Sequence, residues 1–196
     1  MAADRLLLRY RDGALQLSGQ AEAAVVGLWE RREAGQLNDA QFKALAAGVI
    51  AAANARAVTL ADLALSAVLT AELGKVIPPL GLLPTDDGPR LAAAIPTLLD
   101  RAAGLALPGA AAAERATAER AMVARMARSE PLDAASATFQ RGMQRRRVPG
   151  WTRGTGPKPC PLCTSLADGA VLSPSTPMAR HKGCSCYQIP TERTPR

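Results

Sequence analysis

All four cysteines and the only histidine of the chain lie between residues 160 and 186, close to its carboxyl end. They form two patterns: C-x-x-C at Cys160 and Cys163, and H-x-x-C-x-C at His181, Cys184 and Cys186. A tight turn brings two ligands to one ion, and zinc takes four sulfur and nitrogen ligands in a tetrahedron. We therefore predict a structural zinc site formed by Cys160, Cys163, His181 and one of Cys184 and Cys186. The spacing does not choose between the last two.

Three other interpretations of these thiols stay open. The cysteines could form disulfides in an oxidising environment, act as a redox-active pair, or be inert buried thiols. The redox interpretation is disfavoured because Cys160 follows a segment rich in Gly and Pro and opens no βαβ unit. Clustered thiols of a protein made in a reducing cytoplasm bind metal more often than they form disulfides.

The composition changes at residue 148, where Gly and Pro become frequent and helix-forming residues stop. We predict a basic linker over residues 148–159 and a small loop-rich module with β-hairpin character over residues 160–196. A module of this size has little core of its own, and a bound metal is a common way to stabilise one.

Residues 1–147 are predicted to form an alanine-rich helical body, so the fold class is mainly α. Hydrophobic residues make up 48% of the chain but aromatic residues only 3%, which favours closely packed helices with small side chains. We expect a turn at 11–13 and helices over 19–35, 37–74, 90–104, 110–130 and 131–147. In the 37–74 region Thr59 and Asp62 resemble a capping box, which would start a second helix after a bend near 54–59. Ser18 and Asn38 or Asp39 are expected N-caps, and Gly74 is the expected end of the second helix. Residues 75–90, with four prolines, are expected to form a loop.

The net charge of +7 is unevenly distributed along the chain. Residues 1–140 carry a formal charge of −1, and residues 141–196 carry +8. The basic side chains next to the linker are Arg141, Arg145, Arg146, Arg147, Arg153 and Lys158. We expect them to bind DNA or an acidic protein surface. The alternative is a solvated helix end, where arginines favour the negative end of the helix dipole.

Several classes of protein are disfavoured by what the sequence lacks. The amino terminus has charges where a signal peptide would be apolar, and the apolar stretch at 44–58 is interrupted by Asn54 and Arg56. We therefore expect a soluble protein without a membrane partner. No histidine precedes Cys160, so the H-x-E half of a zinc deaminase is missing. One histidine cannot be both a zinc ligand and the general base of a His-Asn-His type nuclease. We expect no enzyme activity.

The segment from Cys160 to Cys186 resembles the carboxyl-terminal motif of the phage Mu F family, the minor head or head morphogenesis proteins of tailed bacteriophages. The matching residues, in order, are Cys160, Pro161, Cys163, Asp168, Gly169, His181, Cys184 and Cys186. Trp151 and Arg153 also stand where such proteins often carry an aromatic and a basic residue.

This resemblance implies a structural role in head assembly, through contacts with the portal or the major capsid protein, and an influence on DNA packaging or ejection. It also implies a protein made in the host cytoplasm and located in the virion, inside the capsid or near the portal. The alternative function is a small zinc-stabilised nucleic-acid-binding protein. Against this alternative, the alanine-rich helices do not present the polar side chains of a base-reading helix.

Overall fold

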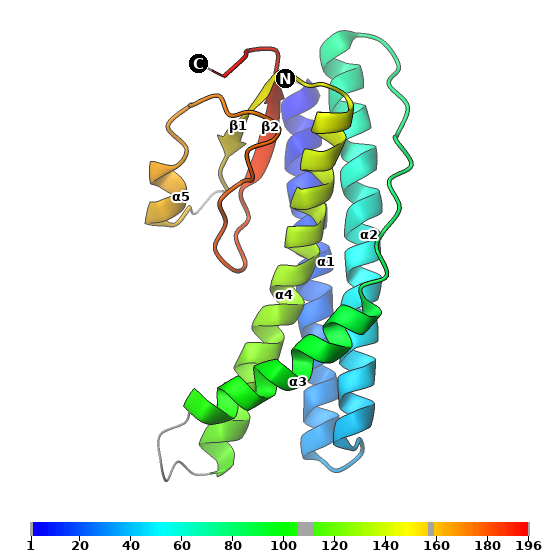
Figure 1. The fold of residues 1–196 in the computed structure, drawn as a ribbon, viewed down its shortest axis with the longest axis vertical. Coiled ribbons are helices and arrows are strands. Elements are labelled where there is room, and N and C mark those ends of the chain that lie inside the picture. Colours follow the sequence, from blue (N-terminus) through cyan, green and yellow to red (C-terminus); the bar gives the residue numbers. More distant parts are fainter. Residues whose placement is uncertain (1, 106–111, 157–158, 196) are drawn as a thin grey trace.

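The fold is mainly helical, with a small loop-rich module at the carboxyl end that contains a two-stranded antiparallel hairpin, as predicted (Figure 1). The computed structural model describes residues 2–105, 112–156 and 159–195. The elements in chain order are α1 (Ala2–Glu33), α2 (Asp39–Leu73), α3 (Gly88–Leu105), α4 (Ala112–Arg145), β1 (Gly150–Gly154), α5 (Pro161–Ser165) and β2 (Tyr187–Thr191). Helices α1, α2 and α4 run side by side along the long axis of the molecule.

Helix α1 is continuous through the segment where we expected a turn and a cap, so both expectations are wrong. Leu7, Tyr10 and Ala14 recur at helical spacing and are buried together on one face. Ser18 lies within the helix, and its hydroxyl donates to the carbonyl of Arg128 on α4 over 2.6 Å. The Arg-Asp-Gly sequence at residues 11–13 favours a turn locally, but the burial of this helix face keeps it helical.

Helix α2 begins and ends where the sequence predicts. Asn38 is its N-cap and forms a capping box with Gln41, and Gly74 closes it with a φ of 63°. The predicted bend near residues 54–59 is wrong, because α2 is a single helix. Thr59 starts no second helix: its hydroxyl donates to the carbonyl of Ala55 within α2.

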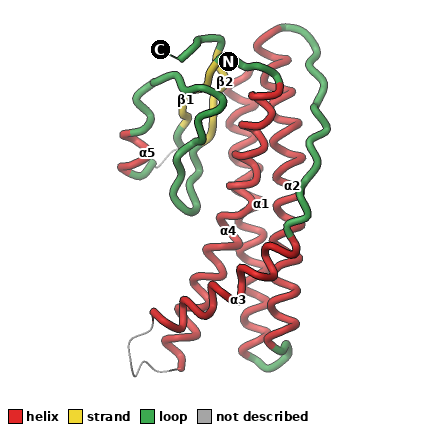
Figure 2. The backbone as a smooth tube through the Cα atoms, viewed as in Figure 1, coloured by secondary structure: helices red, strands yellow, loops and turns green. Residues whose placement is uncertain are grey.

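The segment between α2 and α3 runs back along α2 and is fixed to it by polar side chains (Figure 2). The Asp62 carboxylate accepts from the backbone N–H groups of Leu80 and Leu82, over 3.0 and 3.1 Å. The Thr70 hydroxyl accepts from the N–H of Ile77 over 2.9 Å. These polar residues of an otherwise apolar helix therefore position the loop that the prolines predicted.

Helix α4 continues through Pro131, so the predicted break between residues 130 and 131 is wrong. Val123, Ala127, Leu132 and Ala135 are buried at helical spacing on both sides of this proline. Burial of this continuous face compensates for the backbone hydrogen bond that a proline inside a helix cannot make.

The three long helices are covered by α3 along one half and by the carboxyl-terminal module along the other. Trp29 and Phe42 meet edge to face in the first half, in a core that also includes Ile95 of α3. Tyr10 and Phe139 stack with ring centroids 4.9 Å apart in the second half. That second core also contains Trp151 and three of the cysteines, so the module shares a core with the helices.

The segment expected to be a linker contains β1, which pairs antiparallel with β2. Trp151 lies opposite Pro190 in this pair, and its backbone also exchanges two hydrogen bonds with Leu172, of 2.9 and 2.8 Å. The indole N–H donates to the carbonyl of Ser173 over 2.9 Å. Residues 150–154 are therefore part of the module and do not merely connect it to the helices.

Among the described residues, α2 alone is long and apolar enough to cross a membrane by length and composition. The apolar stretch at residues 44–58 lies within this helix of 35 residues. In its most apolar window 44% of the residues are buried inside the protein.

Candidate metal centre

The first pair of cysteines is positioned by the short helix α5. Cys160 is its N-cap, Pro161 occupies the first turn, and the sulfur of Cys160 accepts from the N–H of Cys163 over 3.4 Å. Proline suits this position because its fixed φ is compatible with the start of a helix. The two sulfurs of the C-x-x-C pattern are thereby brought to the same side of one turn.

The second group of ligands comes from a tight turn. Gly183 has a φ of +75°, a conformation that favours glycine, and the N–H of Cys184 donates to the carbonyl of His181 over 3.0 Å. This turn places the histidine and Cys184 near the sulfurs of α5 and its cap, and Cys186 directly precedes β2. The Asp168–Gly169 pair forms another turn, as expected: Asp168 accepts from the N–H of Ala170, and Gly169 has a φ of +82°.

The structure brings the five predicted ligands into two triads that share Cys163. The Nε2 atom of His181 lies 3.2 Å from the sulfur of Cys160 and 3.4 Å from that of Cys163. The sulfurs of Cys163 and Cys184 are 3.6 Å apart, and Cys186 completes a second triad with these two. All four cysteines carry free thiols. Each triad could hold a metal ion, and buried Cys163 belongs to both.

These separations fit a tetrahedral metal with sulfur and nitrogen ligands. Metal–sulfur bonds of about 2.3 Å and metal–nitrogen bonds of about 2.0 Å at tetrahedral angles separate the ligand atoms by roughly 3.5–3.8 Å. The Nδ1 atom of His181 lies 3.2 Å from the carbonyl of Lys182. A proton on Nδ1 would be donated to that carbonyl, which leaves the Nε2 lone pair directed at the sulfurs.

The thiols have different surroundings. The N–H groups of Cys163 and Leu162 and the nearby histidine lower the pKa of Cys160, which lies at the N-terminus of α5. Burial raises the pKa of Cys163 and, on the other side of the cluster, that of Cys186. Without a cation, the buried sulfurs are therefore held as thiols, and a metal ion would have to displace their protons.

Two arginines that the sequence did not connect with the thiols hold this region. The Nη2 atom of Arg153 donates to the carbonyl of Ala179 over 2.7 Å, while its Nε and Nη1 atoms are buried without a hydrogen-bond partner among the described residues. Arg153 also favours the thiolate form of Cys186. Arg180 donates to the carbonyls of Cys184 and of Leu132 on α4, over 2.6 and 2.7 Å. A buried guanidinium with free donors fits a cluster that becomes anionic when metal binds.

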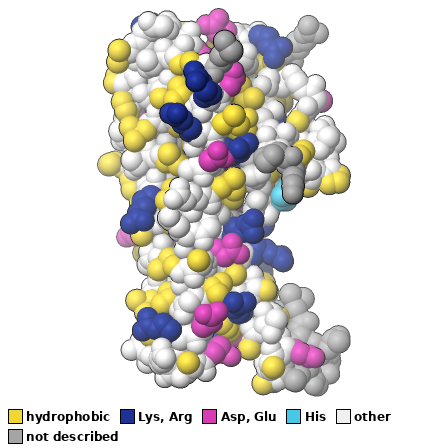
Figure 3. All heavy atoms as spheres, turned by 180° about the vertical axis from the view of Figure 1, so that it is seen from behind, with side chains coloured by type: hydrophobic (Ala, Val, Ile, Leu, Met, Phe, Trp, Pro, Cys, Tyr) yellow, Lys and Arg dark blue, Asp and Glu magenta, His cyan; other side chains and the backbone are white. Residues whose placement is uncertain are grey.

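Five of the six basic residues expected to bind DNA or an acidic protein surface lie in the described part of the chain, and their surroundings differ. Arg145, Arg146 and Arg147 line a cavity of about 520 Å³ at the end of α4. Arg141 donates to the hydroxyl of Thr138 on its own helix, and Arg153 faces the cysteines. Lys158 lies outside the described residues. On the face seen in Figure 3, basic and acidic side chains are interspersed with apolar ones.

The chain was compared with protein-family models, with curated proteins and with solved structures, and none of the three comparisons gave a match.

Proposed function

We propose that the cluster binds one structural Zn²⁺ through Cys160, Cys163, His181 and Cys184. The observation that carries this assignment is the set of short separations around Cys163, which joins the histidine to the second pair of sulfurs. The separation of 3.6 Å between the sulfurs of Cys163 and Cys184 favours Cys184 as the fourth ligand, and Cys186 is then a neighbouring sulfur of the cluster. Zinc with four protein ligands has no open position for substrate, so its role is to stabilise the module.

We further propose that the protein is a minor head protein of a tailed phage, as the resemblance to the phage Mu F family implies. The folded motif supports this: the D-G turn and both ligand turns form one compact unit against α4. The metal would fix this unit to the helical body, which in turn would present surfaces to the portal or the major capsid protein. In this role the protein catalyses no reaction and is located in the virion.

The test uses particles purified from the strain that encodes the chain, probed with an antibody against the protein. We expect the protein in procapsids, at a few copies relative to the major capsid protein, and bound to isolated portal rings. Its absence from particles in which portal and major capsid proteins are both detected would contradict the proposal.

The alternative is a zinc-stabilised nucleic-acid-binding protein, and one observation favours it. Arg145, Arg146 and Arg147 line one cavity, together with Glu72 and Glu192, and offer several cationic donors to phosphate. Such binding weakens steeply as the salt concentration rises, because counterions are released from DNA. Retention on a DNA column that falls with salt and is lost on Arg145→Glu would favour this function, whereas retention that is independent of salt would exclude it.

A further inference from the structure

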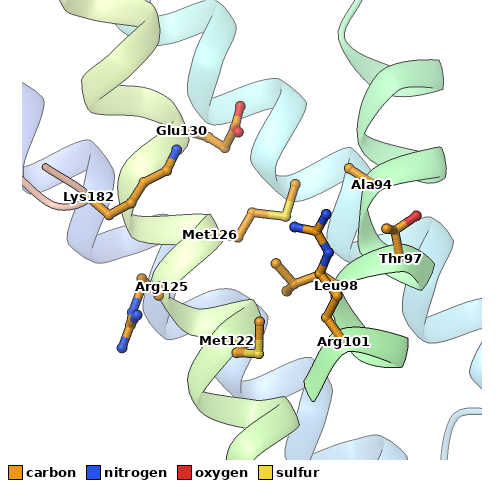
Figure 4. A pocket seen from close by; sticks show the side chains of 9 residues that line it. All are labelled: Ala94, Thr97, Leu98, Arg101, Met122, Arg125, Met126, Glu130 and Lys182. Carbon is orange, nitrogen blue, oxygen red and sulfur yellow. The ribbon is translucent and has the colours of Figure 1, made fainter. Parts of the chain in front are cut away.

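A groove between α3 and α4, which reaches Lys182 next to the proposed ligand His181 at one end, has an apolar floor and a basic rim (Figure 4). Its volume is about 400 Å³. Ala94 and Leu98 of α3 line one wall, and Met122 and Met126 of α4 line the other. Methionine side chains are flexible and polarisable, and they adapt to apolar partners of different shape.

The charges around this groove are mostly positive. Arg101, Arg125 and Lys182 line it, and Figure 4 shows Arg101 reaching toward Met126 while Lys182 lies at the end near Glu130. Glu130, the one acidic residue among the lining residues, is already ion-paired with Arg90. Lys182 is already ion-paired with Asp133 over 3.3 Å, whereas within the part of the chain that the structure describes neither Arg101 nor Arg125 has an ion-pair partner. An occupant with apolar and acidic groups would therefore pack on the apolar floor and form ion pairs with the basic rim.

The length of the groove limits the occupant. Met122 and Glu130 are eight positions apart on α4, which is about 12 Å along a helix axis, or about two turns. We propose that this groove binds a short acidic amphipathic helix of a partner protein. Two or three apolar side chains of that helix lie on the methionines, and flanking carboxylates pair with Arg101 and Arg125. This inference does not depend on the phage assignment or on which metal is bound.

The probe is a fluorescein-labelled helical peptide of about 16 residues, with leucines at i, i+3, i+4 and i+7 and glutamates on the flanks. Its two comparison peptides carry lysine in place of glutamate or serine in place of leucine. Fluorescence anisotropy with the full chain should show the acidic peptide binding at least about tenfold more tightly than either comparison peptide. Its affinity should fall as salt is added, because the flanking ion pairs are exposed.

Variants of the protein locate the binding site. Met122→Glu and Arg101→Glu should each weaken binding of the acidic peptide about tenfold or more. Met122→Leu should retain it, and the matched controls Leu63→Asp and Arg56→Glu, both on the exposed face of α2, should leave it unchanged. Met122 is not part of either buried core, so the variant is expected to fold, and helical circular dichroism checks this.

Three results would overturn the proposal. The first is an acidic peptide that binds no more tightly than its lysine counterpart. The second is binding unaffected by Met122→Glu and Arg101→Glu in folded protein. The third is binding of vesicles with anionic lipid, lost in these two variants and not competed by the peptide, which would assign the groove to a membrane surface.

Discussion

Replacing Trp151 by alanine tests whether the carboxyl-terminal module and the helices unfold as one unit. Trp151 is 0% exposed and belongs to the core that also contains Tyr10 and Phe139. Truncating a buried tryptophan costs about 3–5 kcal/mol, and losing the indole hydrogen bond leaves the Ser173 carbonyl unpaired. We expect the free energy of unfolding to fall by about 4 kcal/mol.

The assay is urea unfolding followed by helical circular dichroism, with zinc bound. With a denaturant dependence of about 2 kcal/mol per molar urea, this loss lowers the midpoint by about 2 M. The matched control is Trp29→Ala, which removes the other tryptophan from the core beside α3. Both variants should shift the same single transition of the helices.

The reasoning would be refuted if Trp151→Ala left the helical midpoint unchanged while Trp29→Ala lowered it. That outcome would describe a module attached by a flexible connection, as the sequence alone suggested. A loss of tertiary signal from the module without a shift of the helical transition would have the same meaning.

Three further perturbations have defined outcomes. Asp62→Ala leaves two loop N–H groups unpaired and should lower the free energy of unfolding by about 2–4 kcal/mol. Urea denaturation measures this loss against the exposed control Asp12→Ala. A loss equal to that of the control would show that the Asp62 carboxylate does not hold the loop. In metal-free protein the lowered pKa of Cys160 enlarges the thiolate fraction of this residue at neutral pH, and the raised pKa of Cys163 reduces the thiolate fraction of Cys163. Because the thiolate is the nucleophile, mass spectrometry should find Cys160 alkylated first. Equal rates at the two thiols would contradict this. Arg153→Gln removes the buried positive charge beside the thiolates and should weaken zinc binding about 10-fold or more in a chelator competition, with Arg153→Lys intermediate; unchanged affinity in both would remove Arg153 from the site.

The ends of the helices could be predicted where local chemistry decides them. Asn38 and Gly74 were identified because a capping side chain and a left-handed glycine act within one turn of the chain. The predicted turn at residues 11–13 and the predicted break at Pro131 were both wrong. In both places burial of a long helical face outweighs the local preference of a few residues. Ser18 and Asp62 resembled caps, but both bind backbone groups far away in the sequence.

The candidate metal centre could be predicted because all of its ligands lie in one short segment. What the sequence could not provide is the support around it. Arg153 was assigned to a basic surface because a sequence does not show which way a charged side chain points. In the structure, the pairing of β1 with β2 turns Arg153 toward Cys186. Trp151 was placed in a linker because the surrounding glycines and prolines hide the strand.

The most direct test is the zinc content and stability of the protein purified from a reducing cytoplasm. Native mass spectrometry should find one zinc per chain, and Cys160→Ser, Cys163→Ser, His181→Ala and Cys184→Ser should each lose it, while Cys186→Ser retains it. Removal of zinc with a chelator should lower the midpoint of the helical unfolding transition, because the module shares its core with the helices. A protein that contains no zinc, takes up none on titration, and unfolds at the same urea concentration with and without chelator would contradict the account.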